Sequence, residues 1–175
     1  VHGDRVEALA GATVGALNHV LTGHVEGGEV SGTVDELIRH AVTKLSHLHF
    51  VANDQARQRL VQLGEHEASI HVIGSPDVDV MNSDALPGID EVRRRYGFDF
   101  DRYAVLAFHP VTSEQLDLRR QVRVLVDEVI ASGRNFVVIY PNNDSGTDHI
   151  LDEYQRLTER RNFRVYPSMR FEYFL

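Results

Sequence analysis

Residues His19–Ala52 read HVLTGHVEGGEVSGTVDELIRHAVTKLSHLHFVA, and the pattern of this stretch decides the fold. The apolar segments at its two ends, His19–Val25 and His49–Ala52, are typical of short strands. Thr33–Ser46 lies between them and carries apolar residues at helical spacing, namely Leu37, Ile38, Ala41, Val42 and Leu45. A strand, a helix and a second strand in this order predict a parallel sheet covered by helices.

The same alternation continues on both sides of this stretch, which makes the chain an α/β protein. The first residues, VHGD, read as the end of a strand, and the Ala-rich segment Val6–Leu17 predicts a helix. Capping boxes are expected at Thr33/Glu36 and at Thr112/Gln115. Further strands are expected at Ile70–Ile73, Tyr103–Phe108, Asn135–Tyr140 and Phe163–Tyr166. Further helices are expected from Asn53 to about Leu63, from Leu118 to Ile130 and from Thr147 to Arg160.

The composition changes at Asn82–Arg102, which is polar and contains Pro87. We read this segment as a connector with one short helix, about Asp90–Tyr96, and place a domain boundary within it. Residues 1–84 and 85–175 are then two Rossmann-like lobes, each with a parallel sheet flanked by helices and each incomplete.

The overall composition excludes several classes of protein. The chain has 175 residues, a formal net charge of −8 and no cysteine. Without cysteine it forms no disulfide, and a reducing compartment is indicated, so we expect a cytoplasmic protein. The acidic balance predicts no nucleic-acid partner. No apolar run reaches the roughly 18–20 residues that span a bilayer, so we expect no membrane partner.

Familiar nucleotide and hydrolase motifs are absent from the sequence. It has no GxGxxG, GxxxxGKS/T or GxSxG motif, which excludes simple dinucleotide-binding, P-loop and serine-hydrolase classes. The HExxH spacing typical of metal sites is absent as well, and we expect no metal ion.

Polar residues follow four of the predicted strands, where open α/β sheets bind ligands. They lie in HGDR (2–5), HVEGGE (24–29), HPVT (109–112) and PNND (141–144). In the first of these, Asp4 suits either a helix N-cap or a base beside the guanidinium of Arg5, a group that binds phosphate.

Glu26 also allows two interpretations. It is either a solvated loop carboxylate or a proton-transfer group in a pocket. The second is favoured by Gly27, Gly28 and Gly32, which allow the positive φ angles of a pocket-lining loop. The neighbouring Glu29 is expected to be solvated.

Three more polar residues stand at element ends. Asp35 either complements the dipole of the helix that starts at Thr33 or takes part in chemistry, and it shares a helix face with Arg39. His109 is either hydrogen-bonded in a turn or, since it precedes a helix N-terminus, a phosphate ligand. Asn142 is a turn former by type and a weaker candidate for a contact to a uridine or a phosphate.

Five segments occur in a characteristic order and spacing: VHGDR (1–5), HVEGGEVSGTVDELIRHAVTKLSHLHF (24–50), VIGSPDVD (72–79), AFHPVT (107–112) and YPNNDSG (140–146). Together they resemble the UDP-N-acetylglucosamine 2-epimerases, specifically the hydrolysing branch that feeds sialic acid synthesis. The resemblance covers nearly the whole chain. It implies two lobes of the glycosyltransferase-B type with a UDP-sugar substrate between them.

The resemblance also implies a reaction and a set of residues. A base removes the C2 proton of UDP-N-acetylglucosamine, UDP leaves C1, and the glycal adds water to give N-acetylmannosamine; no cofactor is required. Asp4, Glu26 and Asp35 match the acid/base group, and His109 matches the ligand of the departing diphosphate. Arg5 and Asn142 match positions implied in UDP binding.

Members of the family are about twice as long as this chain, as two complete lobes require. We therefore expect the chain alone to be inactive or weakly active, and we expect a homo-oligomer. The doubled glycine and Glu29 favour the hydrolysing branch, because the non-hydrolysing enzymes resemble HVEAGLRTG here. The alternatives are a non-hydrolysing epimerase, a hydrolysing epimerase of a UDP-diacetamido-trideoxyhexose, a glycosyltransferase and a nucleotide-sugar sensor.

Overall fold

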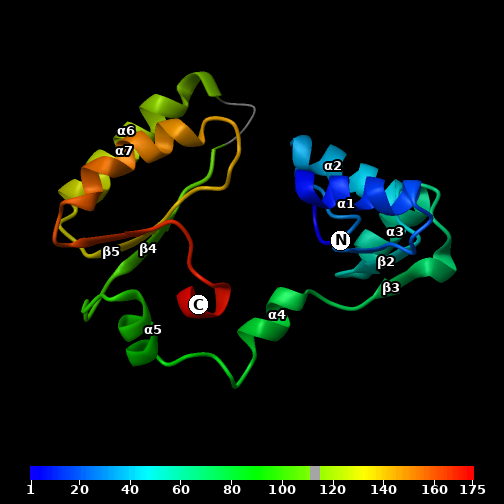
Figure 1. Ribbon diagram of the computed structural model, residues 1–175, viewed down its shortest axis with the longest axis horizontal. Helices are drawn as coiled ribbons and strands as arrows, with labels where there is room; N and C mark the ends of the chain where they lie inside the picture. The colour runs from blue at the N-terminus through cyan, green and yellow to red at the C-terminus, as the bar shows by residue number, and fades with distance from the viewer. Residues whose placement is uncertain (111–114) are drawn as a thin grey trace. The chain divides into compact units, whose positions relative to one another are not determined.

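The computed structural model describes residues 1–110 and 115–175, with only the backbone of Gln115. These residues form two compact units, Val1–Asn82 and Ser83–Leu175. Each unit contains a three-stranded parallel sheet with its strands in sequence order, β1-β2-β3 and β4-β5-β6 (Figure 1). The predicted class, α/β with parallel sheets flanked by helices, is confirmed.

The first sheet consists of β1 (Gly23–Val25), β2 (Leu48–Val51) and β3 (Ile70–Val72). The segment before α1 extends this sheet beside β1, because the Val25 N–H donates to the Val1 carbonyl at 2.9 Å and the Gly3 N–H donates to the Val25 carbonyl at 3.0 Å. The first residues thus pair with β1 in the parallel direction, through an isolated bridge of His2 with Val25. Asp4 follows this bridge, and Glu26 follows the end of β1.

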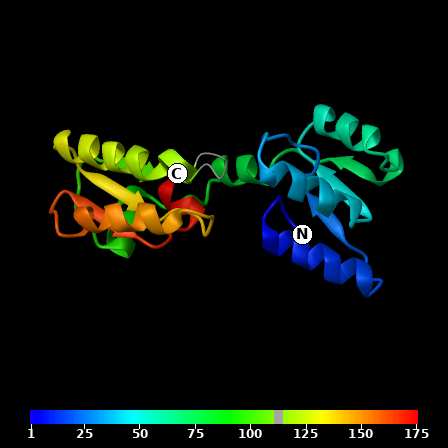
Figure 2. The ribbon, with the colours of Figure 1, turned by 90° about the horizontal axis from the view of Figure 1, so that it is seen from above.

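Three helices, α1 (Val6–Leu17), α2 (Val34–Lys44) and α3 (Asp54–Gln62), lie on the same side of the first sheet (Figures 1 and 2). Buried apolar residues hold them there: Ala8 and Ala12 of α1 pack with Val42 of α2, whereas α3 packs onto β2 and β3 through Val51, Ala56, Leu60 and Ile70. The predicted cap of α3 is confirmed, since Asn53 Oδ1 accepts from the Ala56 N–H at 2.9 Å. The helices thus fix the far ends of the loops that follow the strands.

Two details of the first unit differ from the expectations. The strand expected at His19–Val25 begins only at Gly23, because the Val20 N–H donates to the Gly15 carbonyl and prolongs the end of α1. The Thr33/Glu36 capping box is wrong. Glu36 Oε2 instead accepts from the N–H groups of Ser31 and Gly32, and these bonds lower the pKa of Glu36.

Two short helices of the first unit follow from local signals that the sequence reading passed over. They are η1 (Glu67–Ser69) and α4 (Pro76–Met81). Proline stands at the first position of α4, where its missing N–H costs no helical hydrogen bond, and Asp77 and Asp79 lie in the first turn. The start of α4 fixes the loop after β3.

The second sheet consists of β4 (Ala104–Ala107), β5 (Phe136–Ile139) and β6 (Phe163–Tyr166). Helices α6 (Gln115–Ala131) and α7 (Thr147–Thr158) cover one face, and α5 (Ile89–Tyr96) and α8 (Phe171–Phe174) lie on the other (Figure 1). The larger core is buried between α6, α7 and the sheet, where Val122, Val138, Ile150 and Leu157 are almost inaccessible.

The second half of the expected connector is part of this unit. Its short helix is present as α5, but Val92, Phe98 and Phe100 are buried against Val137 of β5. The polar composition of the segment therefore does not show that these three residues belong to the core of the second unit. The charged residues around the three apolar ones hid the pattern, since α5 has Asp90 in its first turn and arginines in its last.

The second predicted capping box falls outside the part of the chain that the structure describes. Its members are Thr112 and the side chain of Gln115.

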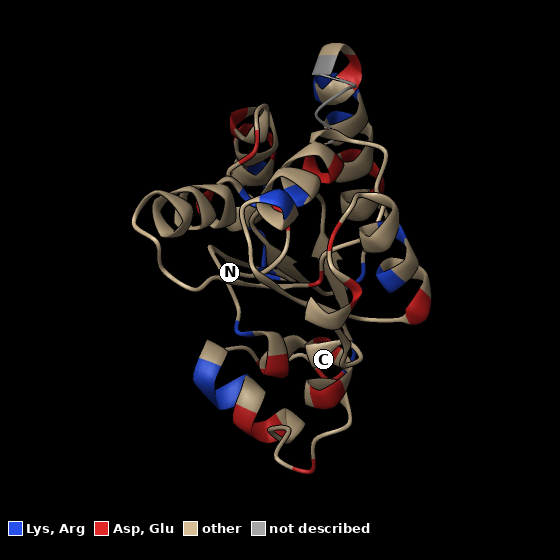
Figure 3. Cartoon of the chain, turned by 90° about the vertical axis from the view of Figure 1, so that its right-hand side faces the viewer, with Lys and Arg blue, Asp and Glu red and all other residues tan. Residues whose placement is uncertain are grey.

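Lys and Arg are intermixed with Asp and Glu along the helices of both units (Figure 3). Across the described ranges, every helix is too short or too polar to pass through a bilayer.

Candidate acid–base site

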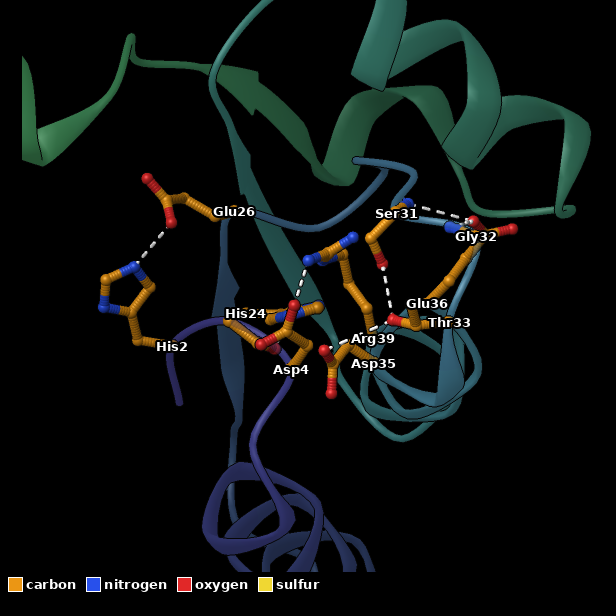
Figure 4. Close-up of polar contacts among 11 residues, drawn as sticks. His2, Asp4, His24, Glu26, Ser31, Gly32, Thr33, Asp35, Glu36 and Arg39 are labelled. Carbon is orange, nitrogen blue, oxygen red and sulfur yellow. Dashed lines mark hydrogen bonds and ion pairs between the residues drawn. The ribbon is translucent and has the colours of Figure 1, made fainter. Parts of the chain in front are cut away.

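The predicted carboxylates Asp4, Glu26 and Asp35 all belong to the first unit (Figure 4). Asp4 and Glu26 follow neighbouring strand ends, and Asp35 lies in the first turn of α2. Open parallel sheets bind ligands at this edge, because the loops that leave the carboxyl ends of the strands diverge there. The site is therefore built from the loop that follows β1 and the turns that flank it.

Glu26 is held in an unusual backbone conformation. Its φ is +65°, and among the described residues only His19 shares a positive φ without being glycine. Its N–H donates to the Phe50 carbonyl at 2.8 Å. Its carboxylate lies 2.8 Å from His2 Nε2 through Oε2, and Oε1 accepts from Ser75 Oγ at 3.1 Å. The side chain is 26% exposed, so Glu26 is not a freely solvated loop carboxylate.

The two glycines after Glu26 serve close packing. A Cβ on Gly28, whose φ is +80°, would lie 2.5 Å from the Ala56 carbonyl oxygen of α3. A Cβ on Gly27 would lie 3.0 Å from His24 Nδ1, and Gly27 is not among the residues with positive φ. The expectation that all three glycines supply positive φ is thus correct for Gly28 and Gly32 and wrong for Gly27.

Asp4 forms an ion pair with Arg39 of α2. Its Oδ2 accepts from Arg39 Nη2, and the side chains are 23% and 11% exposed. Arg5, not Asp4, is the N-cap residue of α1, so the capping interpretation of Asp4 is wrong. The guanidinium instead holds the Asp4 side chain close to the sheet edge.

Asp35 lies on the same helix as Arg39 and one turn before it (Figure 4). Its Oδ2 accepts from Thr33 Oγ1 at 3.3 Å, and it stands in the first turn of α2, where a negative charge complements the helix dipole. This is the structural interpretation of Asp35. Its part in chemistry stays a prediction.

His24 lies beneath the site and is fully buried. Its Nε2 is 2.9 Å from the Gly3 carbonyl, and its Nδ1 is 3.0 Å from Thr43 Oγ1. A carbonyl only accepts, so Nε2 carries the ring proton and Nδ1 accepts from the threonine. Burial lowers the pKa of His24 to about 4. A neutral histidine thus anchors the turn that presents Asp4.

The second unit holds His109 and Asn142, which follow β4 and β5. The Asn142 N–H donates to His109 Nδ1 at 3.1 Å, and both residues are exposed. Because Nδ1 accepts, the neutral ring carries its proton on Nε2 and can donate one hydrogen bond to an anion. The expected turn hydrogen bond is present, and phosphate binding stays a prediction, as does the role of Arg5 in binding UDP.

His2 and Ser75 were not singled out in the sequence. They lie 24 and 49 residues from Glu26 in the chain, and the parallel sheet brings them to it. The only available signal was their place, since each flanks a strand end. Among the described residues, no three His, Asp or Glu side chains are grouped closely enough to hold a metal ion.

The fold and the site define an α/β protein with acid–base residues at the carboxyl edge of a parallel sheet. The chain belongs to the UDP-N-acetylglucosamine 2-epimerase family, whose profile matches residues 1–175. A UDP-N-acetylglucosamine 2-epimerase of Neisseria meningitidis is 52% identical over 175 residues, which are 100% of this chain and 46% of that protein.

Two further comparisons extend this relationship. A hydrolysing UDP-N,N'-diacetylbacillosamine 2-epimerase of Legionella pneumophila is 36% identical over 93% of this chain and 44% of that protein. A crystal structure of UDP-GlcNAc 2-epimerase from Neisseria meningitidis, bound to UDP-GlcNAc, has a TM-score of 0.67 at 16% identity and covers 99% of this chain and 50% of that one. The chain thus spans about half the length of the curated relatives it matches.

Proposed function

We propose that this chain carries part of the active site of a hydrolysing UDP-N-acetylglucosamine 2-epimerase, which converts its substrate and water to N-acetylmannosamine and UDP. The observation that carries the proposal is the position of Glu26, whose carboxylate contacts His2 and Ser75 directly after β1. Because the chain belongs to this family, we propose that proton transfer to and from the sugar takes place at the carboxyl edge of the first sheet. The proposal includes a cytoplasmic homo-oligomer, as the sequence leads us to expect.

The proposed reaction needs two proton transfers at C2. One group removes the C2 proton while the C1–O bond breaks and UDP departs with its electron pair. Water then adds to the glycal, with oxygen bonding to C1 and a proton to C2. Asp4, Glu26 and Asp35 are the groups proposed for these transfers, because carboxylates at hydrogen-bond distance from a substrate act as general acids and bases.

The leaving diphosphate needs donors of positive charge or N–H groups. His109 suits this role, because its Nδ1 accepts from the Asn142 N–H and the proton on Nε2 is left to donate to an anion. Arg5 and Asn142 are proposed as further contacts to UDP. His109 and Asn142 belong to the second unit, and Arg5 belongs to the first.

The substrate has a second candidate. The relative from Legionella acts on UDP-N,N'-diacetylbacillosamine according to its name, and it matches 93% of this chain. A hydrolysing epimerase of a UDP-diacetamido-trideoxyhexose is therefore the alternative that a specific observation favours. A non-hydrolysing UDP-N-acetylglucosamine epimerase is the other.

One experiment separates these activities. The full-length protein that contains this chain is incubated in deuterated water with UDP-N-acetylglucosamine or with UDP-N,N'-diacetylbacillosamine, and the products are followed by NMR. Free N-acetylmannosamine deuterated at C2, together with UDP, is the expected result. UDP-linked N-acetylmannosamine would support the non-hydrolysing enzyme, and turnover of the diacetamido sugar alone would support the alternative substrate. If neither sugar is turned over and neither exchanges its C2 proton, the result contradicts an epimerase.

A further inference from the structure

Glu26 has a histidine partner that the proposed reaction does not use. His2 Nε2 lies 2.8 Å from Glu26 Oε2, and the imidazole is 56% exposed while the carboxylate is 26% exposed. The other oxygen, Oε1, accepts from Ser75 Oγ at 3.1 Å. Figure 4 shows His2 and Glu26 side by side and pointing toward each other. The histidine therefore connects a partly buried carboxylate to solvent.

The chemistry of a C2 epimerase creates a need for such a connection. Inversion at C2 requires that one proton leaves from one face and that another arrives from the opposite face. When two different groups perform these transfers, the first holds an extra proton after the reaction and the second lacks one. Both must be reset before the next turnover, and a histidine at hydrogen-bond distance from the carboxylate offers a direct route to solvent.

We propose that His2 is a proton relay that exchanges the proton of Glu26 with solvent between turnovers, an inference that rests on the proposed function. When Glu26 has gained a proton, the proton passes from Oε2 to Nε2 and leaves the ring for buffer or water. When Glu26 has lost a proton, transfer runs in the reverse direction. His2 acts through Glu26 and is a relay residue, not a catalytic one.

Imidazole suits this task, because it binds and releases protons at neutral pH and has two ring nitrogens for entry and exit. A purely orienting role would need only the N–H group that faces Oε2. His2→Gln separates the two roles, since the glutamine amide can donate from a similar position but cannot exchange a proton. His2→Ala removes the ring and leaves room for free imidazole.

The test measures kcat of the full-length protein with UDP-N-acetylglucosamine at several concentrations of a buffer that titrates near neutral pH. We expect wild-type kcat to be independent of buffer. We expect kcat of His2→Gln to be at least about tenfold lower at low buffer concentration and to recover as the buffer is raised, whereas kcat/KM is unchanged because the reset follows product release. His2→Ala should recover with added imidazole. His66→Gln, at an exposed histidine that caps η1, is the matched control and should behave as wild type.

Three results would contradict the relay but not the proposed function. They are a His2→Gln variant as fast as wild type at low buffer concentration, a loss of kcat that neither buffer nor imidazole restores, and a change in KM with kcat unchanged. The second would assign His2 a structural role. A wild-type protein that turns over neither UDP-sugar would instead contradict the proposed function and, with it, the relay. Circular dichroism of each variant checks that the exposed substitution leaves the fold intact.

Discussion

Glu26 is restrained at both its backbone and its side chain, and this combination distinguishes it from the other acids of the loop. Glu29, three residues on, is an acceptor for the Asn53 side chain at the start of α3. Glu36 binds the backbone of the loop. Only Glu26 of these three directs its carboxylate to His2 and Ser75 at the sheet edge. The three glutamates thus have different partners, and only Glu26 is proposed for proton transfer.

Glu26→Gln is expected to keep the fold and to lower kcat of the full-length protein by about 100-fold or more, because it removes a proton-transfer group and preserves shape. The rate is measured by release of UDP, and the fold by circular dichroism. Glu29→Gln is the matched control and should retain activity. A Glu26→Gln rate within about tenfold of wild type, a barrier change of about 1.4 kcal/mol or less, would exclude Glu26 from the acid/base group.

Arg39→Gln is expected to destabilise the chain by about 1–3 kcal/mol, because it leaves the partly buried carboxylate of Asp4 without its cation. The free energy of unfolding is measured by urea denaturation followed by circular dichroism. The control is Arg57→Gln, which breaks a more exposed ion pair with Glu67 and should cost about 0–1 kcal/mol. Equal losses for the two variants would argue against a special role for the Asp4–Arg39 pair.

The strand-end rule placed Asp4 and Glu26 from the sequence alone, because each follows an apolar segment that could be recognised. It could not find His2 or Ser75. Their contacts with Glu26 depend on which strands are neighbours, and a single sequence does not give strand order. The ion-pair partner of Arg39 could not be predicted for the same reason. Asp35 is near Arg39 in sequence, whereas Asp4 is near it in space.

At the scale of elements, the loop after β1 is shaped by its contacts with α3 as much as by its own turns. Arg59 Nη1 of α3 donates to the Gly28 carbonyl at 2.9 Å, and the absence of a side chain on Gly28 allows α3 to approach. The loop that carries Glu26 is therefore positioned by the helix that follows β2.

Gly28→Ala is expected to destabilise the chain by more than about 1 kcal/mol, because alanine resists a φ of +80° and its Cβ would collide with the Ala56 carbonyl. Gly32→Ala is the matched control: its φ is +68° but nothing lies within 4 Å of the added Cβ. Its cost should be limited to the backbone term of about 1 kcal/mol. Urea denaturation of both variants measures the difference, and equal costs would show that the approach of α3 is not limiting.

Sequence patterns predicted the elements well where apolar periodicity was long. The bounds of α1 and β6 agree with the predicted ranges, and α2, α3, α6 and α7 were found with small shifts. Patterns failed for short elements whose signal is local, such as α4. They also failed for Phe98 and Phe100, which alternate in a charged segment and are buried in a cluster with Val92 and Val137.

At the scale of the molecule, the candidate acid–base residues lie in the first unit, whereas the proposed nucleotide contacts are divided between Arg5 of the first unit and His109 and Asn142 of the second. Each unit has its own core, so the fold of each can be tested separately from catalysis. In the first unit, His24 and His49 are paired in register on β1 and β2, and both are fully buried. The sheet that carries the acid–base residues thus contains two neutral imidazoles in its interior.

These imidazoles predict that the first unit loses stability in acid. Burial lowers the pKa of His24 to about 4 and also lowers that of His49, although Glu65 partly opposes the shift of His49. Below the ordinary histidine pKa of about 6.5, the unfolded chain binds protons that the folded chain does not. Stability is therefore complete above that pH and falls toward pH 4, by about 3 kcal/mol from His24 alone.

Urea denaturation at pH 7 and pH 5, followed by circular dichroism, measures this effect. His24→Gln keeps a donor for the Gly3 carbonyl and should flatten the acid dependence. His66→Gln, at an exposed position, should leave it unchanged. A stability that is equal at both pH values in the unsubstituted chain would show that the buried histidines are not protonated on unfolding.

The left-handed backbone of Glu26 has a consequence for which residues position 26 would accept if folding alone selected them. Glycine adopts a φ of +65° without a steric penalty, and alanine and glutamate do not. Glu26→Gly should therefore be more stable than Glu26→Ala by about 1 kcal/mol, although both lack the carboxylate. If Glu26 takes part in turnover as proposed, position 26 is a point of conflict between stability and activity, because the side chain then holds a conformation that folding would assign to glycine.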